Sequence, residues 1–227
     1  DHAVLHQVAA GIVGDHRVKG KYTASQARRF SLVGARKFMR LDKPEFAHLD
    51  IFGDCGAFTY VQEDQPPYSP TEMAEFYDES GFTHGCSVDH IIFDFDASLP
   101  AMQGGSQDAR ARFDITLENA EGFRREARAM GASFKPLGVI QGWSPGSMAE
   151  AARRLVAMGY DYLALGGMVP LKSPEIKICL DAIRAAFGPR YATLERPIWR
   201  DGEPFQIDLR VDRELVAEDD SSFQRQA

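Results

Sequence analysis

Short apolar runs alternate with longer amphipathic segments along the first 190 residues. The runs are four to six residues long and lack strict alternation of apolar and polar positions. That pattern is typical of strands buried on both faces of a parallel sheet. The runs cover residues 37–41, 49–52, 88–93, 137–140 and 162–165. We therefore predict a strand over each run and a helix between successive strands.

Hydroxyl side chains mark the expected helix starts, because they can accept from the free N–H groups of a first turn. The expected starts are Thr23, Ser69, Ser106, Ser147 and Ser173. Three of them, at 23, 69 and 147, have Gln or Glu three residues later, which is the spacing of a capping box. Pro70 and Pro174 occupy first helical positions, where the missing N–H costs nothing. Glycines suited to left-handed C-terminal caps stand at positions 34, 81, 131, 159 and 188.

The repeated strand–helix pattern predicts an α/β fold. By itself it leaves two architectures open, an open doubly wound sheet and a (β/α)8 barrel. The pattern changes near the C-terminus: residues 205–211 alternate apolar and polar positions as a half-exposed strand does, and residues 218–227 read as a polar tail. We expect residues 1–190 to form the α/β domain and residues 191–227 a divergent segment.

Composition limits the class of protein only broadly. The 227 residues are 44% hydrophobic, which suits one globular domain, and no apolar run approaches the ~20 residues needed to cross a bilayer. The sequence does not open on a charged-then-apolar leader, so a cytoplasmic protein without a membrane partner is expected. Cys55, Cys86 and Cys179 are scattered without a C-x-x-C pair. They are expected to be reduced core thiols, and neither a metal nor a cofactor is expected.

The net charge of −7 bears on the kind of partner, because a nucleic-acid-binding surface is expected to be basic. Residues 201–227 alone have a balance of −5. The rest of the chain is therefore close to neutral, which is compatible with nucleic-acid binding. A near-neutral body can still carry a basic stripe, although the overall balance of charge does not show one.

Functional sites form at the carboxyl ends of the strands in both candidate architectures. The candidate groups at these ends are Asp54, Asp89, Asp94, Gln141, Gly166, Gly167 and Met168. Carboxylates and an amide can recognise the donor and acceptor edge of a purine-like base, and glycines let a flat ring approach the backbone closely. Phe58, Trp143 or Met168 could provide a stacking surface.

Each of these groups also has a purely structural interpretation. Asp54 can cap a turn, Gln141 can bond to neighbouring backbone groups, and Gly166-Gly167 is compatible with a simple tight turn. His90 is expected to be a hydrogen-bonded packing residue rather than a catalytic one. Lys172 is expected to be a solvated lysine, with phosphate binding before a helix start as the alternative.

The motifs taken in order resemble those of the tRNA-guanine transglycosylases. Residues 53–58, Gly-Asp-Cys-Gly-Ala-Phe, are similar to the aspartate motif D-S-G-G-F of that family. Residues 138–142 followed by 165–169 resemble its G-I-V-Q-G and G-G-L segments. Residues 66–69 and 87–90 are similar to the DpdA-type branch, whose members insert 7-deazaguanine bases into DNA. The resemblance covers roughly residues 5–187.

The resemblance implies a (β/α)8 barrel, incomplete here at its C-terminal end, and a base-exchange reaction without a cofactor. In that reaction a carboxylate attacks the sugar C1′, guanine leaves, and a 7-deazaguanine such as preQ0 replaces it, which is pentosyltransferase chemistry of EC 2.4.2 type. By position, the resemblance implies that Asp54 is catalytic and handles a proton of the base. It implies that Asp89 or Asp94 binds the purine edge. The other implied base-binding positions are Gln141, Gly166, Gly167 and Met168, with Phe58 beside them.

Two family features are absent from the sequence. The first is the context of the nucleophilic aspartate, G-x-x-x-F-D, which is not found after Gly188; Asp208 is the nearest candidate there. The second is the zinc motif C-x-C-x-x-C. The expected partners are a 7-deazaguanine base and nucleic acid, DNA in preference to tRNA, with accessory DNA-modification proteins. The alternatives are a barrel that binds base or a partner subunit without chemistry, and an unrelated barrel enzyme for a small phosphorylated substrate.

Overall fold

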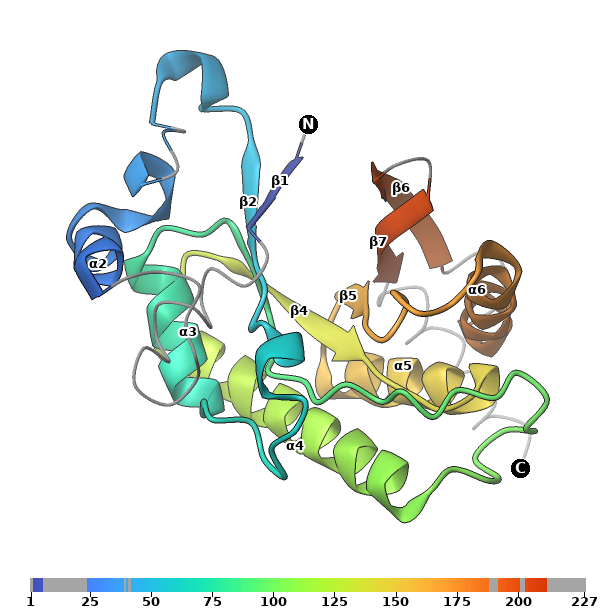
Figure 1. Cartoon of the computed structure of the whole chain (residues 1–227). Helices are drawn as coiled ribbons and strands as arrows, with labels where there is room; N and C mark the ends of the chain where they lie inside the picture. The colour runs from blue at the N-terminus through green and yellow to red at the C-terminus, as the bar shows by residue number, and fades with distance from the viewer. Residues whose placement is uncertain are drawn as a thin grey trace, which may run out of the picture. The chain divides into compact units, whose positions relative to one another are not determined.

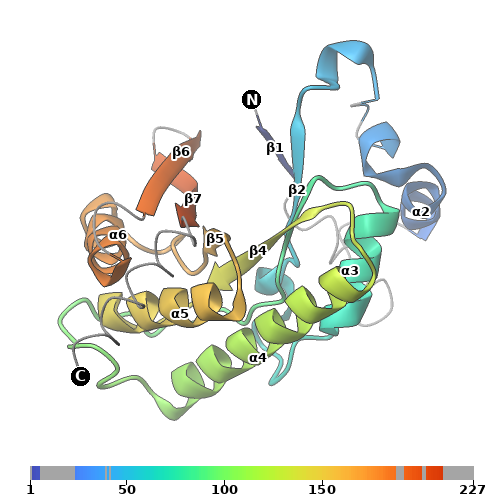
Figure 2. The same cartoon turned by 180° about the vertical axis from the view of Figure 1, so that it is seen from behind.

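A computed structural model of the chain describes residues 2–5, 24–38, 40, 42–187, 192–200 and 203–211. The described residues divide into two compact units. Unit 1 draws on residues 1–91 and 118–137, and unit 2 on residues 92–117 and 138–227. Helix α4 (Gln107–Ala129) and strand β4 (Lys135–Ile140) each contribute residues to both units (Figures 1 and 2).

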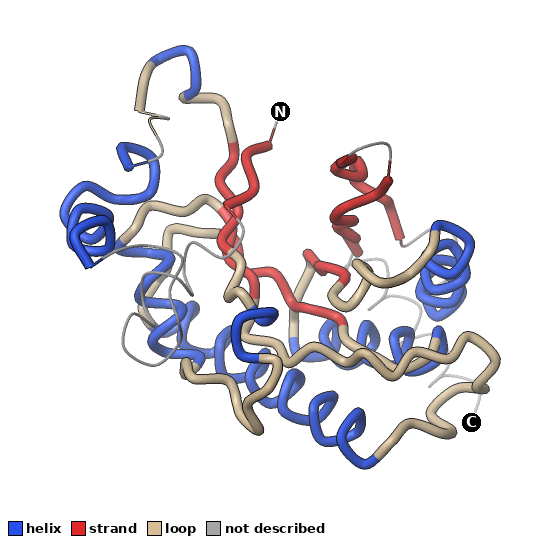
Figure 3. Tube along the Cα trace, viewed as in Figure 1, coloured by secondary structure: helices blue, strands red, loops and turns tan. Residues whose placement is uncertain are grey.

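Five described strands run parallel and pair in chain order. They are β1 (His2–Leu5), β2 (Asp50–Gly53), β3 (His84–Cys86), β4 and β5 (Tyr162–Leu165). The helices between and after them are α2 (Ala24–Phe38), α3 (Pro70–Glu79), α4, α5 (Pro145–Met158) and α6 (Ser173–Phe187), with short 3-10 turns η1 (Pro44–Phe46) and η2 (Ala57–Tyr60). The chain is thus an α/β fold of repeated strand–helix units, as predicted (Figure 3).

An antiparallel hairpin follows α6. Strands β6 (Ala192–Arg200) and β7 (Glu203–Val211) pair antiparallel, and β7 also pairs antiparallel with β5. The strand predicted over residues 205–211 is confirmed, and the polar tail at 218–227 lies outside the described residues. The division into domains between residues 190 and 191 stays a prediction.

Two of the expected helix starts have the expected caps. At Ser69, the hydroxyl accepts from the Glu72 N–H at 3.2 Å, and the Glu72 carboxylate accepts from the Ser69 N–H at 2.8 Å. The Ser106 hydroxyl accepts from the N–H of Ala109 at 3.0 Å at the start of α4. Helix α6 begins at Ser173. Helix α2 begins at Ala24, while the expected Thr23 lies outside the described residues.

The start expected at Ser147 is wrong by three positions. Helix α5 begins at Pro145, and Ser144 is its N-cap. The Ser144 hydroxyl accepts from the Ser147 N–H at 3.1 Å, and the Ser147 hydroxyl accepts from the Ser144 N–H at 2.9 Å. Ser147 therefore fills the capping-box position that Glu usually occupies. Glu150 instead pairs with arginines one turn later in the helix.

Two of the expected strands are also wrong. In the run 37–41, Lys37 and Phe38 are the last residues of α2, because Gly34, at φ 75°, kinks the helix instead of ending it. The run 88–93 forms no strand, and β3 ends before it.

Side chains rather than a strand partner satisfy the backbone in residues 88–93. The Tyr60 hydroxyl donates to the Asp89 carbonyl at 2.9 Å, and the Ile92 N–H donates to the Gln141 side chain at 3.3 Å. Val88 is nevertheless buried in the core of unit 1. The run therefore has the apolar composition of a buried strand but does not form one.

Tyr77 of α3 lies at the centre of the unit 1 core. Its ring makes edge-on contacts, 5.3–5.9 Å between centroids, with Phe82, Phe123 and Phe134. A Cβ atom at Gly85 would lie 2.5 Å from the Tyr77 ring, and a Cβ atom at Gly53 would overlap it. Glycine is therefore needed in β2 and β3 so that α3 can pack directly on them. This accounts for Gly53, the first residue of the 53–58 motif.

Trp143, which follows β4, lies in the core of unit 2. Its Nε1 donates to the Gln103 carbonyl at 3.1 Å, and its ring packs edge-on against Phe113 at 5.4 Å. A Cβ atom at Gly105 would lie 2.7 Å from the indole. Trp143 is thus a core residue and not the exposed stacking surface considered for it. No helix in the described part of the chain is long and apolar enough to cross a membrane.

We expect Tyr77→Phe to leave the free energy of unfolding unchanged or to raise it, and Tyr60→Phe to lower it. The Tyr77 hydroxyl is buried without a hydrogen-bond partner among the described residues. Such a group costs about 1–3 kcal/mol, and removing it relieves that cost. The Tyr60 hydroxyl donates to the Asp89 carbonyl at 2.9 Å, so its loss costs about 0.5–1.5 kcal/mol. Denaturant unfolding measures both variants, and a larger loss for Tyr77→Phe would contradict this packing.

Candidate functional site

Asp54 directly follows β2 and is half-buried. Its Oδ1 accepts from the N–H of Gly56 at 2.9 Å, and Gly56 has the left-handed φ of 75°. Asp54 therefore closes a turn, which is the structural role considered for it. A carboxylate has about four acceptor positions, so this bond is compatible with a role in base binding.

Asp89 is 5% exposed and is bonded through both its side chain and its main chain. The Cys55 thiol donates to Asp89 Oδ1 at 3.0 Å, and the Tyr60 hydroxyl donates to the Asp89 carbonyl at 2.9 Å. The sulfur and the hydroxyl oxygen also lie 3.0 Å apart. Each donor has one proton, so in this arrangement both protons point at Asp89. The segment that follows β2 thus fixes the position of Asp89.

Both donors keep their protons at neutral pH. Burial raises the pKa of the Cys55 thiol well above its usual range, and the negative charges of Asp89 and Asp54 raise it further. Burial likewise raises the pKa of Tyr60, with added contributions from Cys55 and Asp89. Cys55 is therefore a hydrogen-bond donor and not a thiolate nucleophile.

Sequence reasoning identified Cys55 as a reduced core thiol, and this is confirmed. Its bond to Asp89, 34 residues later, was missed. Only the register of β2 and β3, which places Gly53 opposite Gly85, brings the two strand ends together. No local motif in the sequence could have indicated the contact.

His90 has a structural role, as expected. It is fully buried, and its Nε2 lies 2.8 Å from the Glu63 carbonyl. A carbonyl only accepts, so Nε2 carries the proton.

Phe58, in η2, is 44% exposed, whereas Met168 is 6% exposed. Of these two expected base contacts, Phe58 therefore presents the open surface.

Gln141 follows β4 and is 1% exposed. Its Oε1 accepts from the Ile92 N–H at 3.3 Å, which is the backbone contact considered for it. A Cβ atom at Gly166 would overlap the Gln141 amide, and one at Gly167, where φ is 70°, would lie 3.0 Å from Oε1. The Gly166 N–H also donates to the Ile140 carbonyl at 2.8 Å. The glycine pair therefore makes room for the Gln141 side chain at the end of β5.

Asp89 and Asp94 lie in different surroundings. Asp89 is buried in unit 1, bonded to the residue that follows Asp54. Asp94 is exposed in unit 2, where its Oδ2 accepts at 2.5 Å from the Ser106 hydroxyl that caps α4. The geometry thus groups Asp89 with the residues after β2, within unit 1.

Asp208 lies in β7, opposite Ala164 of β5. Neighbouring strands are ~4.8 Å apart, so the Asp208 backbone is next to the end of β5 that leads into Gly166. Its side chain lies outside the described part of the structure.

Lys172 is exposed, as expected for a solvated lysine. Within the described ranges, no three His, Cys, Asp or Glu side chains converge as metal ligands would.

Comparison with known proteins supplies independent evidence. No protein-family model matches the chain. A curated protein of Salmonella montevideo, named DNA-guanine transglycosylase, is 40% identical to it over 167 residues. The matched part is 73% of this chain and 39% of that protein, so the chain spans about two fifths of its relative's length. This identity confirms the resemblance in the motifs: the chain is a relative of the DNA-acting members of the tRNA-guanine transglycosylase superfamily.

Proposed function

We propose that this chain forms part of a transglycosylase that exchanges guanine in DNA for a 7-deazaguanine base such as preQ0. The observation that carries the proposal is the 40% identity to a DNA-guanine transglycosylase. The groups at the strand ends support it. Asp54 and Asp89 after β2 and β3, and the Gln141 amide after β4, are side chains that can recognise the edge of a purine-like base.

The order of the strands supports a (β/α)8-type barrel that is incomplete at its C-terminal end. The five parallel strands pair in chain order. They lack the reversal of order that marks an open doubly wound sheet. The hairpin β6–β7 then follows α6 with antiparallel pairing, which departs from a barrel repeat.

We assign roles within this proposal as follows. A carboxylate attacks the sugar C1′, and the bond to guanine breaks with its electron pair on the departing base. A ring nitrogen of the incoming base then attacks C1′, and the bond between C1′ and the carboxylate breaks, which frees the carboxylate. Asp54 gives a proton to that base and takes one from the incoming base. Asp89 binds the purine edge, since it is buried beside the Asp54 turn while Asp94 caps a helix start. Cys55 and Tyr60 hold Asp89 in place.

Two measurements on the 227-residue chain test the proposal. The first is a titration with preQ0 and with guanine, and the second is the exchange of labelled guanine in duplex DNA. Binding with exchange supports the full proposal. Binding without exchange indicates a chain that holds the base but lacks the chemistry, which is the alternative function. Failure to bind either base would contradict both.

We expect Asp54→Asn to lower the exchange rate by at least about 100-fold, because asparagine cannot transfer the proton. The fold should remain intact, since an asparagine oxygen can still accept from the Gly56 N–H. Asp114→Asn, an exposed carboxylate on α4, is the matched control and should exchange normally. Exchange rates and denaturant unfolding of the two variants decide the point. Normal exchange by Asp54→Asn would remove Asp54 from the catalytic group.

We expect Cys55→Ala to weaken preQ0 binding by about 10- to 100-fold, because it removes a hydrogen bond to the Asp89 carboxylate. Cys55→Ser keeps a donor at the same place, as in the family motif, and should retain most of the affinity. The dissociation constants and the free energies of unfolding are measured together. If Cys55 had only a structural role, the loss of preQ0 affinity would follow the loss of unfolding free energy, and it would do so in both variants.

We expect Asp208→Asn to abolish exchange while leaving the affinity for free preQ0 unchanged, because a nucleophile acts on the sugar and not on the base. Glu203→Gln, in the same strand β7, is the control for disturbance of the hairpin. The exchange assay and the preQ0 titration are run on both variants. Exchange at the normal rate by Asp208→Asn would place the nucleophile elsewhere.

A further inference from the structure

Residues 17–43 form a basic segment in an acidic chain. They contain nine of the 26 Lys and Arg residues but one of the 33 Asp and Glu residues. Such a segment agrees with the near-neutral balance of residues 1–200, which allows a basic stripe. The net charge of −7 conceals this segment because acidic residues elsewhere outweigh it.

Four cations of this segment form a surface on and just after α2, which we name the α2 basic surface: Arg28, Arg29, Lys37 and Arg40. All four are exposed, and among the described residues none of them forms an ion pair. Some cations on other helices are paired with acids of the same helix, as in Arg153–Glu150 and Lys177–Asp181. The positive charge of the α2 basic surface is thus left facing solvent.

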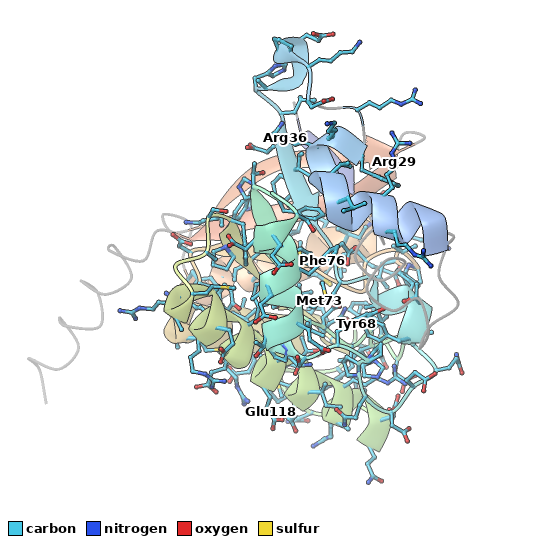
Figure 4. The ribbon with its side chains drawn as sticks, turned by 90° about the vertical axis from the view of Figure 1, so that its left-hand side faces the viewer. Arg29, Arg36, Tyr68, Met73, Phe76 and Glu118 are labelled. Carbon is cyan, nitrogen blue, oxygen red and sulfur yellow. The ribbon has the colours of Figure 1, made fainter. Side chains whose placement is uncertain are left out.

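Two contacts fix the second half of α2 within unit 1. The Arg36 guanidinium donates to the Leu49 carbonyl at 2.8 Å, just before β2 begins. Gly34 lies against the main chain of Ser80, where a Cβ atom would be 3.4 Å from the Ser80 carbonyl oxygen. Figure 4 labels Arg29 and Arg36 on this helix. The part of α2 that carries Lys37 is therefore held against the rest of unit 1.

We propose that the α2 basic surface binds the phosphate backbone of duplex DNA. Arg28 and Arg29 lie before the kink in α2, and Lys37 and Arg40 lie after it, so the cations are spread along the segment. Duplex DNA carries one charge per ~1.7 Å of its axis, so such a surface meets several phosphates at once. The choice of DNA as the polyanion rests on the proposed function.

The chemistry of the surface favours DNA over an anionic membrane. A helix that lies on a membrane needs a continuous apolar face opposite its cations. On the described part of α2, Leu32 is the large apolar side chain that is exposed, at 84%. Val33 and Phe38 are half-buried. Among the described side chains of α2, one exposed leucine does not make an apolar face, whereas phosphate contacts require only the cations.

This surface also has a role in the proposed reaction. An enzyme that acts on a base of duplex DNA must move the nucleotide out of the stack, which costs a few kcal/mol. Contacts to the backbone carry no sequence information but hold the duplex in register. The α2 basic surface would therefore hold the duplex while the base is extruded, and it would act on DNA of any sequence.

The test compares two variants with the same net charge. The first carries Arg28→Gln, Arg29→Gln, Lys37→Gln and Arg40→Gln. The matched control carries Arg125→Gln, Arg128→Gln, Arg153→Gln and Lys177→Gln, four exposed cations on α4, α5 and α6. Fluorescence anisotropy with a labelled duplex of random sequence gives the dissociation constant at several salt concentrations.

For the α2 variant we expect binding to weaken at least about tenfold at low salt. The slope of log K against log salt should become shallower by about 0.9 for each phosphate that the variant no longer neutralises, so by up to about 3.6. The control should stay within about twofold of the unaltered chain, because its cations lie outside the surface. This pair of results would support the proposal.

Three results would overturn the proposal. The first is an unchanged salt slope in the α2 variant, and the second is equal weakening in both variants, which would indicate net charge alone. The third is binding to vesicles rich in phosphatidylserine that the α2 variant loses while its DNA binding persists. A preQ0 titration of the same variants separates this inference from the proposed function. If no variant binds the base but the α2 variant alone fails to bind DNA, the surface stands and the base-exchange proposal fails.

Discussion

A buried carboxylate must be satisfied by donors, and this requirement organises unit 1. Asp89 is 5% exposed, and the Cys55 thiol and the Tyr60 hydroxyl bind its side chain and its main chain. These donors come from the turn and the short helix η2 that follow β2. That turn is closed by Asp54 through the Gly56 N–H. Satisfying Asp89 therefore also fixes the segment that carries Asp54, and the two carboxylates proposed to serve one base are coupled through Cys55.

Close packing of α3 determines where these strand ends lie. The Tyr77 ring occupies the space over Gly53 and Gly85, so a side chain at either glycine would push the helix off the sheet. A similar arrangement occurs in unit 2, where Gly166 and Gly167 leave room for the Gln141 amide. In both units, glycines next to the candidate groups admit a protein side chain. The sequence predicted that glycines let a ligand ring approach the backbone. In the structure the space beside these glycines holds protein side chains instead, so the glycines act by positioning those side chains.

The distribution of charge matters more for this chain than its total. A net charge of −7 argues against a nucleic-acid partner only if the charges are evenly spread. Screening limits exposed charges to a range of about 10 Å, so an approaching duplex responds to the nearest surface and not to the whole molecule. The exposed cations on α2 are separated along the chain from the acids after residue 200. A relative that acts on DNA and an acidic overall composition are therefore compatible.

The sequence by itself determined the features that depend on neighbours in the chain. Hydrophobic runs and helix caps predicted the α/β alternation and the starts at Ser69 and Ser106, because caps are bonds between residues three apart. The ordered motifs predicted the family. Tertiary structure decided what depends on distant partners: residues 88–92 are buried without forming a strand, and the side chains of Tyr60 and Gln141 bond to two of their backbone groups. It also grouped Asp89 with the segment that carries Asp54, since only the pairing of β2 with β3 brings residues 55 and 89 together. Sequence periodicity records which residues are buried, whereas the identity of their partners depends on pairing between segments far apart in the chain, as between Cys55 and Asp89.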